Sequence, residues 1–434
     1  KRKLFEFVES ARTFDLSPSE IRQQLTGSDE LRDAFGAAAA SLTEAYLQIV
    51  DTQNGAVDYD EMIYGAADIL EAHSDEFAKK YDHLLVDEFQ DVSDAEIRLI
   101  NALIGERGGP HLFCVGDDWQ SIYGFAGSDV TNFTQFTKKY RNVTYTELQI
   151  NYRCPPDIVN AGVELMSKSE EPQNSKSVIA DNDAPCKPKL HLIEDDYDDE
   201  APEYVADLIS KKLDKEFNYD EIMILGSNDD GSPRMGDLRD KLRDMEIPHS
   251  CSDDPDHLPS WYEDELEYPI EMDNGDAKYL QTADVPEELA GERVPLVQVQ
   301  SIHKSKGTEA PVVILLDALD DTLSGLPRSE RVDRLLEPAN AISADRVAEE
   351  RRLCYVALTR CETEFHAISQ TGNISRYLTD IDEWFTRLRR DWLLVGTVTE
   401  ISYPDPDTNR PIIEEIAPDA PHDPGIHIRT VQAD

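Results

Sequence analysis

The sequence predicts an α/β protein in which helices alternate with short, buried parallel strands. Two apolar runs, 83–86 and 111–115, each end abruptly in acidic and amide side chains. Buried parallel strands have this character, and they deliver polar groups to the carboxyl edge of a sheet. Residues at helical spacing fill the intervals around these runs, as expected for strands joined by helical crossovers.

Helices are expected throughout residues 1–56, where apolar side chains recur at helical spacing. The next helix is predicted to begin at Asp58, because Glu61 three positions later completes a capping box. The strand at 83–86 follows this helix. The first part of the chain therefore reads as a helical segment that leads into a sheet.

A second capping box, formed by Ser93 and Glu96, predicts the helix between the two apolar runs. Gly105 is expected to end this helix, because glycine tolerates the left-handed conformation common at helix ends. The strand at 111–115 then follows.

A second α/β unit is predicted from about residue 148, and Pro155-Pro156 is expected to open its first helix, through Met166. The acidic, proline-rich segment 228–292 predicts a long loop or a reduced insertion. Residues 391–434 predict a small hairpin or a tail. The strands expected in this unit are 188–193, 221–226, 296–302, 312–316 and 363–368. The helices expected are 201–213, 235–245, 345–359 and 375–390.

The charge of the chain is strongly negative. Lys plus Arg is 42 and Asp plus Glu is 89, so the formal net charge is 42 − 89 = −47. A nucleic-acid-binding protein normally presents a basic face, so one interpretation excludes nucleic acid. The other is adaptation to a high-salt, halophilic cytoplasm, where the Debye length falls to about 3 Å at 1 M and repulsion from phosphates is screened. The even spread of acids favours the second.

Six cysteines are present, and none forms a Cys-x-x-Cys pair. This spacing disfavours zinc and iron–sulfur sites and indicates reduced core thiols. The sequence shows neither a signal peptide nor a long apolar run, which predicts a cytoplasmic protein without a membrane partner.

Five segments together resemble the motifs of the UvrD/Rep-type superfamily 1 DNA helicases, in the order that the family has them. The segments that resemble motifs II to VI are 87–91 (DEFQD), 116–125 (GDDWQSIYGF), 151–153 (NYR), 301–309 (SIHKSKGTE) and 349–360 (EERRLCYVALTR). Each is weak alone, and the ordered set is specific.

The resemblance implies two RecA-like parallel-sheet motor domains, the first incomplete at its N-terminus and carrying a helical insertion. Residues 1–56 would be the end of the inserted helical subdomain, and 57–147 the later part of the first motor domain. Residues 148–390 would be the second motor domain, with its insertion reduced to the acidic segment at about 228–292, and 391–434 a C-terminal extension.

The resemblance also implies the residues that bind ATP and Mg²⁺. Asp87 would serve the metal, Glu88 would be the general base and Gln120 would sense the γ-phosphate. The structural alternatives are an acidic helix start for the two carboxylates and a polar turn for Gln120.

On the second motor domain, Tyr152 would stack on adenine, and Arg153 and Arg360 would contact the γ-phosphate. Gly307 and Glu309 would lie at the nucleotide, with Glu309 on the ribose. The alternatives are a surface ion pair for Arg153 and a helix C-terminal cation for Arg360.

Single-stranded DNA is the partner that the resemblance implies. Tyr123 and Phe125 would stack on bases, and His303 would couple DNA to the nucleotide cleft. The aromatic residues could equally be core, and a lone histidine after a strand is more often structural. The family's Trp-Arg-Gly is replaced by Phe125-Ala126-Gly127, which removes one arginine contact.

No Gly-x-x-x-x-Gly-Lys-Ser/Thr loop occurs in the 434 residues. Because that loop normally holds the β- and γ-phosphates, the sequence predicts a missing N-terminal P-loop segment and strands 83–86 and 111–115 without their central neighbour. Three functions stay open: a helicase that needs this segment, an ATPase-inactive module that binds DNA or protein, and a helicase fused to a nuclease. The nuclease function is least favoured, because 391–434 shows no cluster of acids with a lysine.

Overall fold

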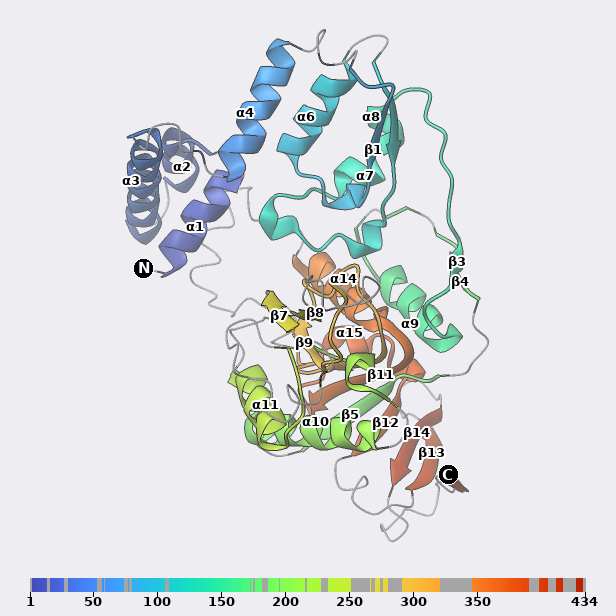
Figure 1. Cartoon of the computed structure of the whole chain (residues 1–434). Coiled ribbons are helices and arrows are strands. Elements are labelled where there is room, and N and C mark those ends of the chain that lie inside the picture. The colour runs from blue at the N-terminus through green and yellow to red at the C-terminus, as the bar shows by residue number, and fades with distance from the viewer. Residues whose placement is uncertain are drawn as a thin grey trace. The chain divides into compact units, whose positions relative to one another are not determined.

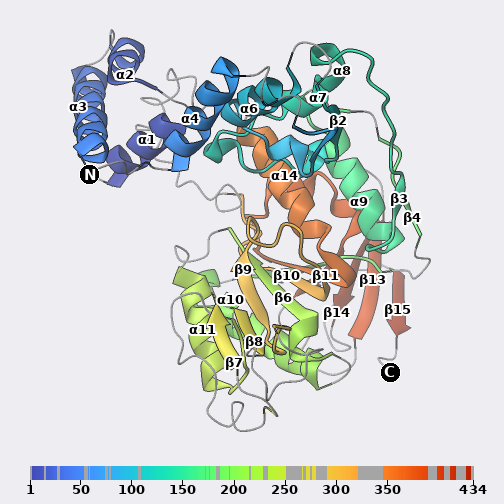
Figure 2. The same cartoon turned by 45° about the horizontal axis from the view of Figure 1, so that its top comes forward.

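The structure is a computed structural model of the whole chain (Figures 1 and 2). The chain divides into two compact units. Unit 1 comprises Lys1–Thr146, Glu170–Ser175 and Arg328–Arg352, and unit 2 comprises Glu147–Ser169, Lys176–Pro327 and Leu353–Asp434. The structure describes residues 2–13, 16–26, 30–52, 57, 59–73, 77, 80–105, 109–171, 173–174, 176–181, 186–194, 196–214, 217–227, 233–250, 266, 270–273, 276–279, 291–320, 346–389, 398–404, 411–416 and 427–431.

Unit 1 opens with the helices α1 (Arg2–Thr13), α2 (Pro18–Leu25) and α3 (Glu30–Thr52), as the periodicity predicts. Ser17 caps α2 in a reciprocal capping box with Glu20, and Pro18 occupies the first helical turn, where its missing N–H has no helical role. The three helices share a small buried core that includes Phe7, Ile21 and Leu25.

The helix α4 (Tyr59–Ala72) packs against α6 (Asp94–Ile104). Arg98 of α6 bonds the carboxylates of Asp68 and Glu71 of α4 at 2.7 and 2.9 Å. The predicted capping box of Ser93 and Glu96 at the start of α6 is confirmed, and so is Gly105 at its end. The capping role of Asp58 falls on a residue outside the described ranges.

The predicted strands of unit 1 are β1 (His83–Val86) and β2 (His111–Cys114), which pair in parallel with each other. On one face, Leu84 and Val86 pack against the buried Phe89. On the other face, Leu85 and Phe113 lie directly across from one another and are 71% and 60% exposed. One side of this two-stranded sheet is therefore apolar and open to solvent.

Short helical turns follow the two strands of unit 1: the first, after β1, carries motif II, and the others, after β2, begin with motif III. Phe133 and Phe136 from these turns pack against Phe89 beneath β1. The turns are η1 (Phe89–Asp91), η2 (Asp118–Gln120), η3 (Gly124–Ala126), α7 (Thr131–Thr134) and α8 (Phe136–Lys139).

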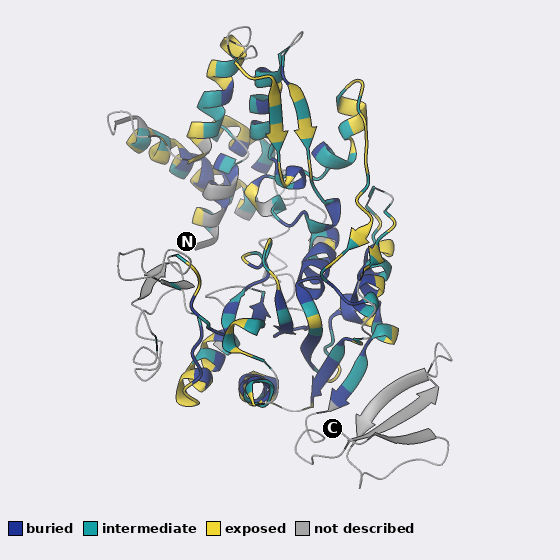
Figure 3. Ribbon diagram, turned by 45° about the vertical axis from the view of Figure 1, so that its right-hand side comes forward, coloured by how far each residue is buried: buried dark blue, intermediate teal, exposed yellow. Residues whose placement is uncertain are grey.

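Unit 2 is built on a nine-stranded sheet in the order β15-β13-β14-β12-β5-β11-β10-β6-β9. Its central strands are parallel, and the β6 and β10 side chains are almost entirely buried (Figure 3). All five strands that the sequence predicts here are present. They are β5 (Lys189–Ile193), β6 (Ile222–Gly226), β9 (Gln298–Ser301), β10 (Ala310–Leu315) and β11 (Cys361–Gln370).

The helices α10 (Tyr197–Leu213) and α11 (Pro233–Asp244) pack with the central strands into one apolar core that includes Ile224 and Ile314. The helices α9 (Pro156–Ser167) and α14 (Arg346–Leu358) meet at Gly162, where an added Cβ would lie 3.0 Å from the ring of Tyr355. Short two-stranded sheets are formed by β3 (Ile150–Asn151) with β4 (Ile179–Ala180) and by β7 (Ile270–Asp273) with β8 (Asp276–Tyr279).

The predicted helix at 375–390 is wrong. The chain there forms a single turn, α15 (Arg376–Thr379), then η7 (Asp382–Trp384) and the strand β12 (Thr386–Arg389), which pairs in parallel with β5. Tyr377, Ile381 and Phe385 recur every four residues, as on one face of a helix, but pairing of 386–389 with β5 makes the end of this segment a strand.

Two other segments hold more regular structure than expected. Within 228–292, predicted to be a long loop or a reduced insertion, α11 confirms the helix predicted at 235–245, and the antiparallel hairpin of β7 and β8 was not predicted. The hairpin predicted within 391–434 is confirmed as β13 (Val398–Pro404) and β14 (Pro411–Ile416), with β15 (His427–Val431) beside them. β14 pairs with β12, so these strands extend the central sheet.

Candidate functional site

The chain leaves β1 directly into the two acids of motif II. The carboxylates of Asp87 and Glu88 are both exposed, and the Asp87 Oδ1 accepts a hydrogen bond from the Glu88 amide at 2.9 Å. Glu88 adopts the left-handed conformation, with φ 49°. This conformation is costly for a residue with a Cβ, and such strain gathers at functional sites.

Gln90 ties motif II to motif III. Its side chain is fully buried, and its Nε2 donates to the Glu88 Oε2 at 2.5 Å. Its Oε1 accepts from the Asp117 amide at 2.8 Å. Gly116 permits this approach, because a Cβ there would lie 2.4 Å from the Gln90 Oε1. Gln90 lies in the motif II segment, but no role was predicted for it from the sequence. The feature that could have indicated a role is an amide two residues after the acids at a strand end.

Gln120, the expected γ-phosphate sensor, is held by an acid of its own motif. Its Nε2 donates to the Asp117 Oδ2 at 2.8 Å, while the Asp117 Oδ1 accepts from the Trp119 amide at 3.1 Å. Ser121 continues the link, because its hydroxyl donates to the Gln90 main-chain carbonyl at 3.1 Å. Motifs II and III thus form one connected polar cluster.

Tyr123 lies beside the same cluster. Partial burial raises the pKa of its phenol, and the carboxylates of Asp91 and Glu88 raise it further. A cavity of about 270 Å³ opens next to it, and its lining residues are Thr13, Ile63, Tyr64, Asp91, Ser93, Ala95, Glu96, Tyr123 and Ala126. The backbone of Phe125 lies in η3, and its side chain falls outside the described part of the chain.

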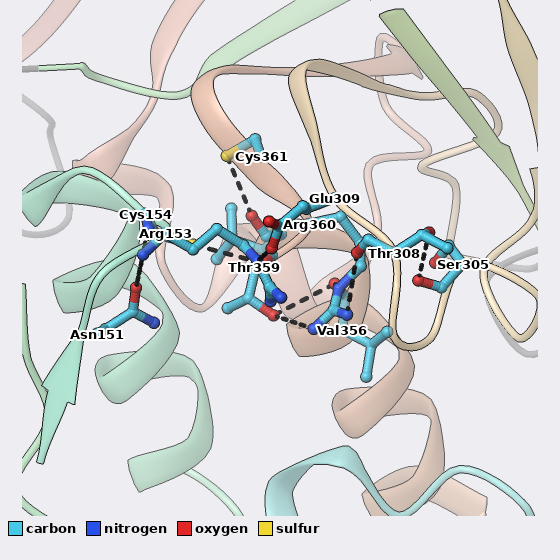
Figure 4. Close-up of polar contacts among 11 residues, drawn as sticks. Asn151, Arg153, Cys154, Ser305, Thr308, Glu309, Val356, Thr359, Arg360 and Cys361 are labelled. Atoms are coloured by element: carbon cyan, nitrogen blue, oxygen red, sulfur yellow. Dashed lines mark hydrogen bonds and ion pairs between the residues drawn. The ribbon is translucent and has the colours of Figure 1, made fainter. Parts of the chain in front are cut away.

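Arg153 and Arg360 are brought together in unit 2 (Figure 4). An Nη of Arg153 donates to the Thr359 carbonyl at 3.4 Å, and an Nη of Arg360 donates to the Thr359 Oγ1 at 3.4 Å. Arg360 is almost fully buried and also donates to the main-chain carbonyls of Val356 and Thr308, at 3.1 and 3.3 Å.

Glu309 forms an ion pair with Arg153. The alternative of an ion pair for Arg153 is therefore observed, and its partner is another predicted nucleotide residue. Two thiols flank the arginines. A hydrogen bond with the thiol of Cys361, followed by the charges of Arg153 and Arg360, lowers the pKa of Cys154. Burial raises the pKa of Cys361 well above its usual range.

The turn that carries Tyr152 and Arg153 is fixed by Asn151. The Asn151 Oδ1 accepts hydrogen bonds from the amides of Arg153 and Cys154, at 3.0 and 2.8 Å. Tyr152 itself is 73% exposed, so its ring is available for stacking. Asn151 is a second residue for which no role was predicted from the sequence. Its signal was an amide immediately before the tyrosine and arginine.

The motif V turn presents Gly307 in the left-handed conformation, with φ 81°, next to the exposed Glu309. Glycine suits this backbone, because a Cβ would be strained there. His303 is half-buried in the same turn. The acids belong to unit 1 and the arginines to unit 2, and the geometry of each cluster is internal to its own unit.

The described residues contain no group of three or more His, Cys, Asp or Glu side chains placed to hold a metal ion. Asp87 fits a site of another kind. Magnesium usually takes one or two carboxylates and completes its shell with water and substrate phosphates. An exposed carboxylate at a strand end meets that need. Among the described helices, none is long and apolar enough to cross a membrane.

Comparisons with known proteins match an N-terminal and a C-terminal part of the chain to two different family models. Residues 1–141 match the family model of the UvrD/REP helicase N-terminal domain, and residues 280–370 match that of the UvrD-like helicase C-terminal domain. The first range contains motifs II and III, and the second contains motifs V and VI. Arg153 lies between the two ranges.

Three curated relatives illustrate the similarity. DNA helicase IV of Escherichia coli (strain K12) is 29% identical over 363 residues, which are 81% of this chain and 43% of that protein. ATP-dependent DNA helicase PcrA of Leuconostoc citreum is 32% identical over 142 residues, 32% of this chain and 19% of the relative. ATP-dependent DNA helicase UvrD1 of Mycobacterium leprae (strain TN) is 28% identical over 205 residues, 44% and 26% of the two chains. The chain thus matches less than half the length of each.

Proposed function

Because the chain belongs to the UvrD/Rep-type superfamily 1 helicases, we propose that it acts as a 3′–5′ translocase on single-stranded DNA in repair or replication, driven by ATP with Mg²⁺. The observation that carries the proposal is the ordering of the motif residues within each unit. Gln90 joins the motif II acids to motif III, and Thr359 joins Arg153 to Arg360.

On the first unit, Asp87 would hold Mg²⁺ and Glu88 would accept the proton of the attacking water. The Gln90 amide holds one Glu88 oxygen, which would orient the carboxylate as the base. Gln120 would contact the γ-phosphate, and its present bond to Asp117 gives it a resting partner.

On the second unit, Arg153 would exchange its partner Glu309 for a phosphate, which a guanidinium binds through two parallel hydrogen bonds. Arg360 would contribute the second guanidinium, Tyr152 would stack on adenine, and Glu309 would then reach the ribose beside Gly307. The exposure of Tyr152 and Glu309 supports these roles.

Single-stranded DNA would contact Tyr123 and Phe125 by base stacking, which tolerates any sequence. His303 would link the DNA path to motif V. Tyr123 lies near enough to Glu88 for that carboxylate to raise the pKa of its phenol. The proposed nucleobase contact is therefore close to the proposed general base, which supports this role.

The absence of Gly-x-x-x-x-Gly-Lys-Ser/Thr from these 434 residues favours a second candidate, an ATPase-inactive module that binds DNA or protein. In the helicase proposal, turnover needs such a loop from outside this sequence. The discriminating measurement is phosphate release with single-stranded DNA, on this chain and on the chain with any residues that precede Lys1 in its gene. DNA-stimulated release by the longer form supports the helicase; its failure supports the module.

DNA binding is tested by fluorescence anisotropy of a labelled oligo-dT strand in molar KCl. Replacing Tyr123 with Ala is expected to weaken binding about tenfold, since one stacked base contributes about 1–3 kcal/mol. Tyr59→Ala, which removes an exposed ring from α4, is the matched control and should bind as the unchanged chain does. Equal affinities for all three proteins would contradict stacking on Tyr123.

Nucleotide binding is tested with a fluorescent ATP analogue and Mg²⁺. Arg153→Ala should weaken analogue binding, because it removes a guanidinium from the phosphate-binding pair. The matched control is Arg387→Ala, which removes an arginine paired with Asp382 at 2.8 Å elsewhere in unit 2. The proposal fails at this site if both variants bind the analogue equally well.

A further inference from the structure

The first turns of α14 hold the motif III turn by its main chain. The Gly124 amide donates to the Glu349 Oε1 at 3.0 Å, and the Nε of Arg352 donates to the carbonyl of Ser121. Glu349 and Arg352 are three positions apart, so they lie on the same face of the helix. All four residues belong to unit 1.

Arg352 is also held by a second partner. Its guanidinium is buried and forms an ion pair with the Glu171 carboxylate. A buried guanidinium that lost its partners would be strongly destabilising, so this arrangement resists displacement. Nearby, the Asn174 amide donates to the buried Asp118 at 2.9 Å, which attaches the 171–174 segment to the start of motif III.

The two clamped groups flank Tyr123. The Ser121 carbonyl precedes Ile122, which is fully buried, and the Gly124 amide follows Tyr123. Within the turn, the Tyr123 carbonyl accepts from the amides of Ala126 and Ser128, at 2.9 and 3.2 Å. Main-chain groups on both sides of the tyrosine are therefore held, and the direction of its Cα–Cβ bond is set by the helix.

We propose that Glu349 and Arg352 are positioning residues that orient the Tyr123 ring for stacking on a nucleic-acid base. The inference rests on the proposed function, in which Tyr123 contacts single-stranded DNA. A ring that must stack on any base needs a fixed plane, because the energy of stacking depends on face-to-face overlap. The clamp fixes the backbone and the Cα–Cβ direction from which the ring extends, which limits the planes that the ring can adopt, and neither residue needs to touch the DNA.

The charge of Glu349 makes the test sharp. DNA is a polyanion, so removal of a nearby carboxylate should strengthen binding by electrostatics alone. A positioning role predicts the opposite sign. Glu350→Ala on the same helix is the control for the electrostatic effect, and Glu349→Gln keeps a side-chain oxygen that can accept from the Gly124 amide.

The experiment compares two strands of equal length, oligo-dT and an abasic strand that has phosphates and sugars but no bases. Glu349→Ala should bind oligo-dT about fivefold more weakly, with its affinity for the abasic strand unchanged or raised. Stacking on one base raises the affinity about tenfold or more, and the clamp accounts for part of that gain. Glu349→Gln should restore oligo-dT binding. Arg352→Lys keeps the charge but cannot hold Ser121 and Glu171 together through one planar fork, so it should weaken oligo-dT binding and leave the abasic affinity unchanged.

Thermal unfolding shows whether Glu349→Ala folds, and if it does not, Arg352→Lys replaces it as the test variant. Equal losses on both strands, or no loss on oligo-dT, would overturn the positioning role. Failure of the underlying function has a different signature, in which Tyr123→Ala itself leaves oligo-dT affinity unchanged.

Discussion

The Nε2 of His191 lies 2.8 Å from the Nδ1 of His366, and both imidazoles are buried in the sheet of unit 2. The Tyr204 hydroxyl is 2.7 Å from the His191 Nδ1, and the His366 Nε2 is 2.9 Å from the Glu364 Oε2. A carboxylate can only accept, so His366 donates to Glu364, His191 donates to His366, and Tyr204 donates to His191. With both rings neutral, this single order of protons satisfies every atom.

We predict that acid weakens this part of the fold. Burial lowers the pKa of His366 to about 4, and burial together with the neighbouring His366 lowers that of His191 well below 6.5. The unfolded imidazoles therefore bind protons first as the pH falls below 6.5, and stability decreases from there towards pH 4. Burial alone would raise the pKa of Glu364, but the hydrogen bond with His366, followed by Lys189 and Lys212, lowers it, so its contribution decreases below pH 4.5 in the same direction.

The measurement is the urea midpoint at fixed salt between pH 7.5 and pH 4.5. Each proton taken up on unfolding contributes a slope of about 1.4 kcal/mol per pH unit. Replacement of both histidines with Gln, which can donate and accept without titrating, should flatten the dependence above pH 4.5. An unchanged slope in that variant would show that other groups cause it.

The capping box of α6 should contribute measurable stability. Ser93→Ala removes the oxygen that accepts from the Glu96 amide at 3.3 Å and should cost about 1 kcal/mol. Ser167→Ala, at the end of α9, removes an exposed hydroxyl that bonds the Glu164 carbonyl and should stay within about 0.5 kcal/mol. Chemical denaturation of the two variants compares them directly; equal effects would remove the cap as the explanation.

Gly162 should resist enlargement. Val at this position is expected to cost about 1–3 kcal/mol, because its Cβ would lie 3.0 Å from the buried Tyr355 ring and its methyl groups need further space. Gly65 lies within the helix α4, and no described atom is within 4 Å of the place a Cβ would take. Gly65→Ala should therefore stabilise by about 0.5–1 kcal/mol. Thermal midpoints test both, and a stabilising Gly162→Val would contradict the packing of α9 on α14.

Salt should stabilise the chain. With a formal charge of −47, the folded state is destabilised by repulsion among its own charges, which ions screen. The Debye length falls from about 10 Å at 0.1 M salt towards 3 Å and below at molar salt. The unfolding temperature should therefore rise steeply between about 0.1 and 2 M KCl. Sucrose at matched osmolality stabilises without screening and is the control. Parallel responses to KCl and sucrose would count against a halophilic surface.

The sequence predicted most of the fold because its local signals agree with the tertiary structure. Local signals begin or end elements where expected: the acids after 86 follow the end of β1, the capping box at Ser93 begins α6, and the prolines at 155–156 begin α9. The segment 375–390 was mispredicted because Tyr377, Ile381 and Phe385 are buried at helical spacing although the chain turns towards β5. Burial alone cannot distinguish these structures when the partner strand is nearly two hundred residues away.

Within the candidate site, sequence motifs identify the residues that carry charge or an aromatic ring. They do not identify the residues that hold them. The roles of Gln90, Asn151 and Glu349 consist of hydrogen bonds to main-chain groups or to neighbouring side chains, and such bonds depend on three-dimensional contacts. Their signals were only polar residues inside a motif. The functional roles of the charged residues stay predictions that the binding experiments test.

Glu88 occupies a backbone geometry that suits glycine or asparagine better than glutamate. Random mutagenesis screened only for heat resistance would therefore enrich Gly or Asn at position 88. Under the proposed function, in which Glu88 is the general base, a screen for phosphate release would retain Glu. The two selections would favour different residues at position 88. Engineering for thermal stability should therefore leave Glu88 unchanged if activity is to be kept.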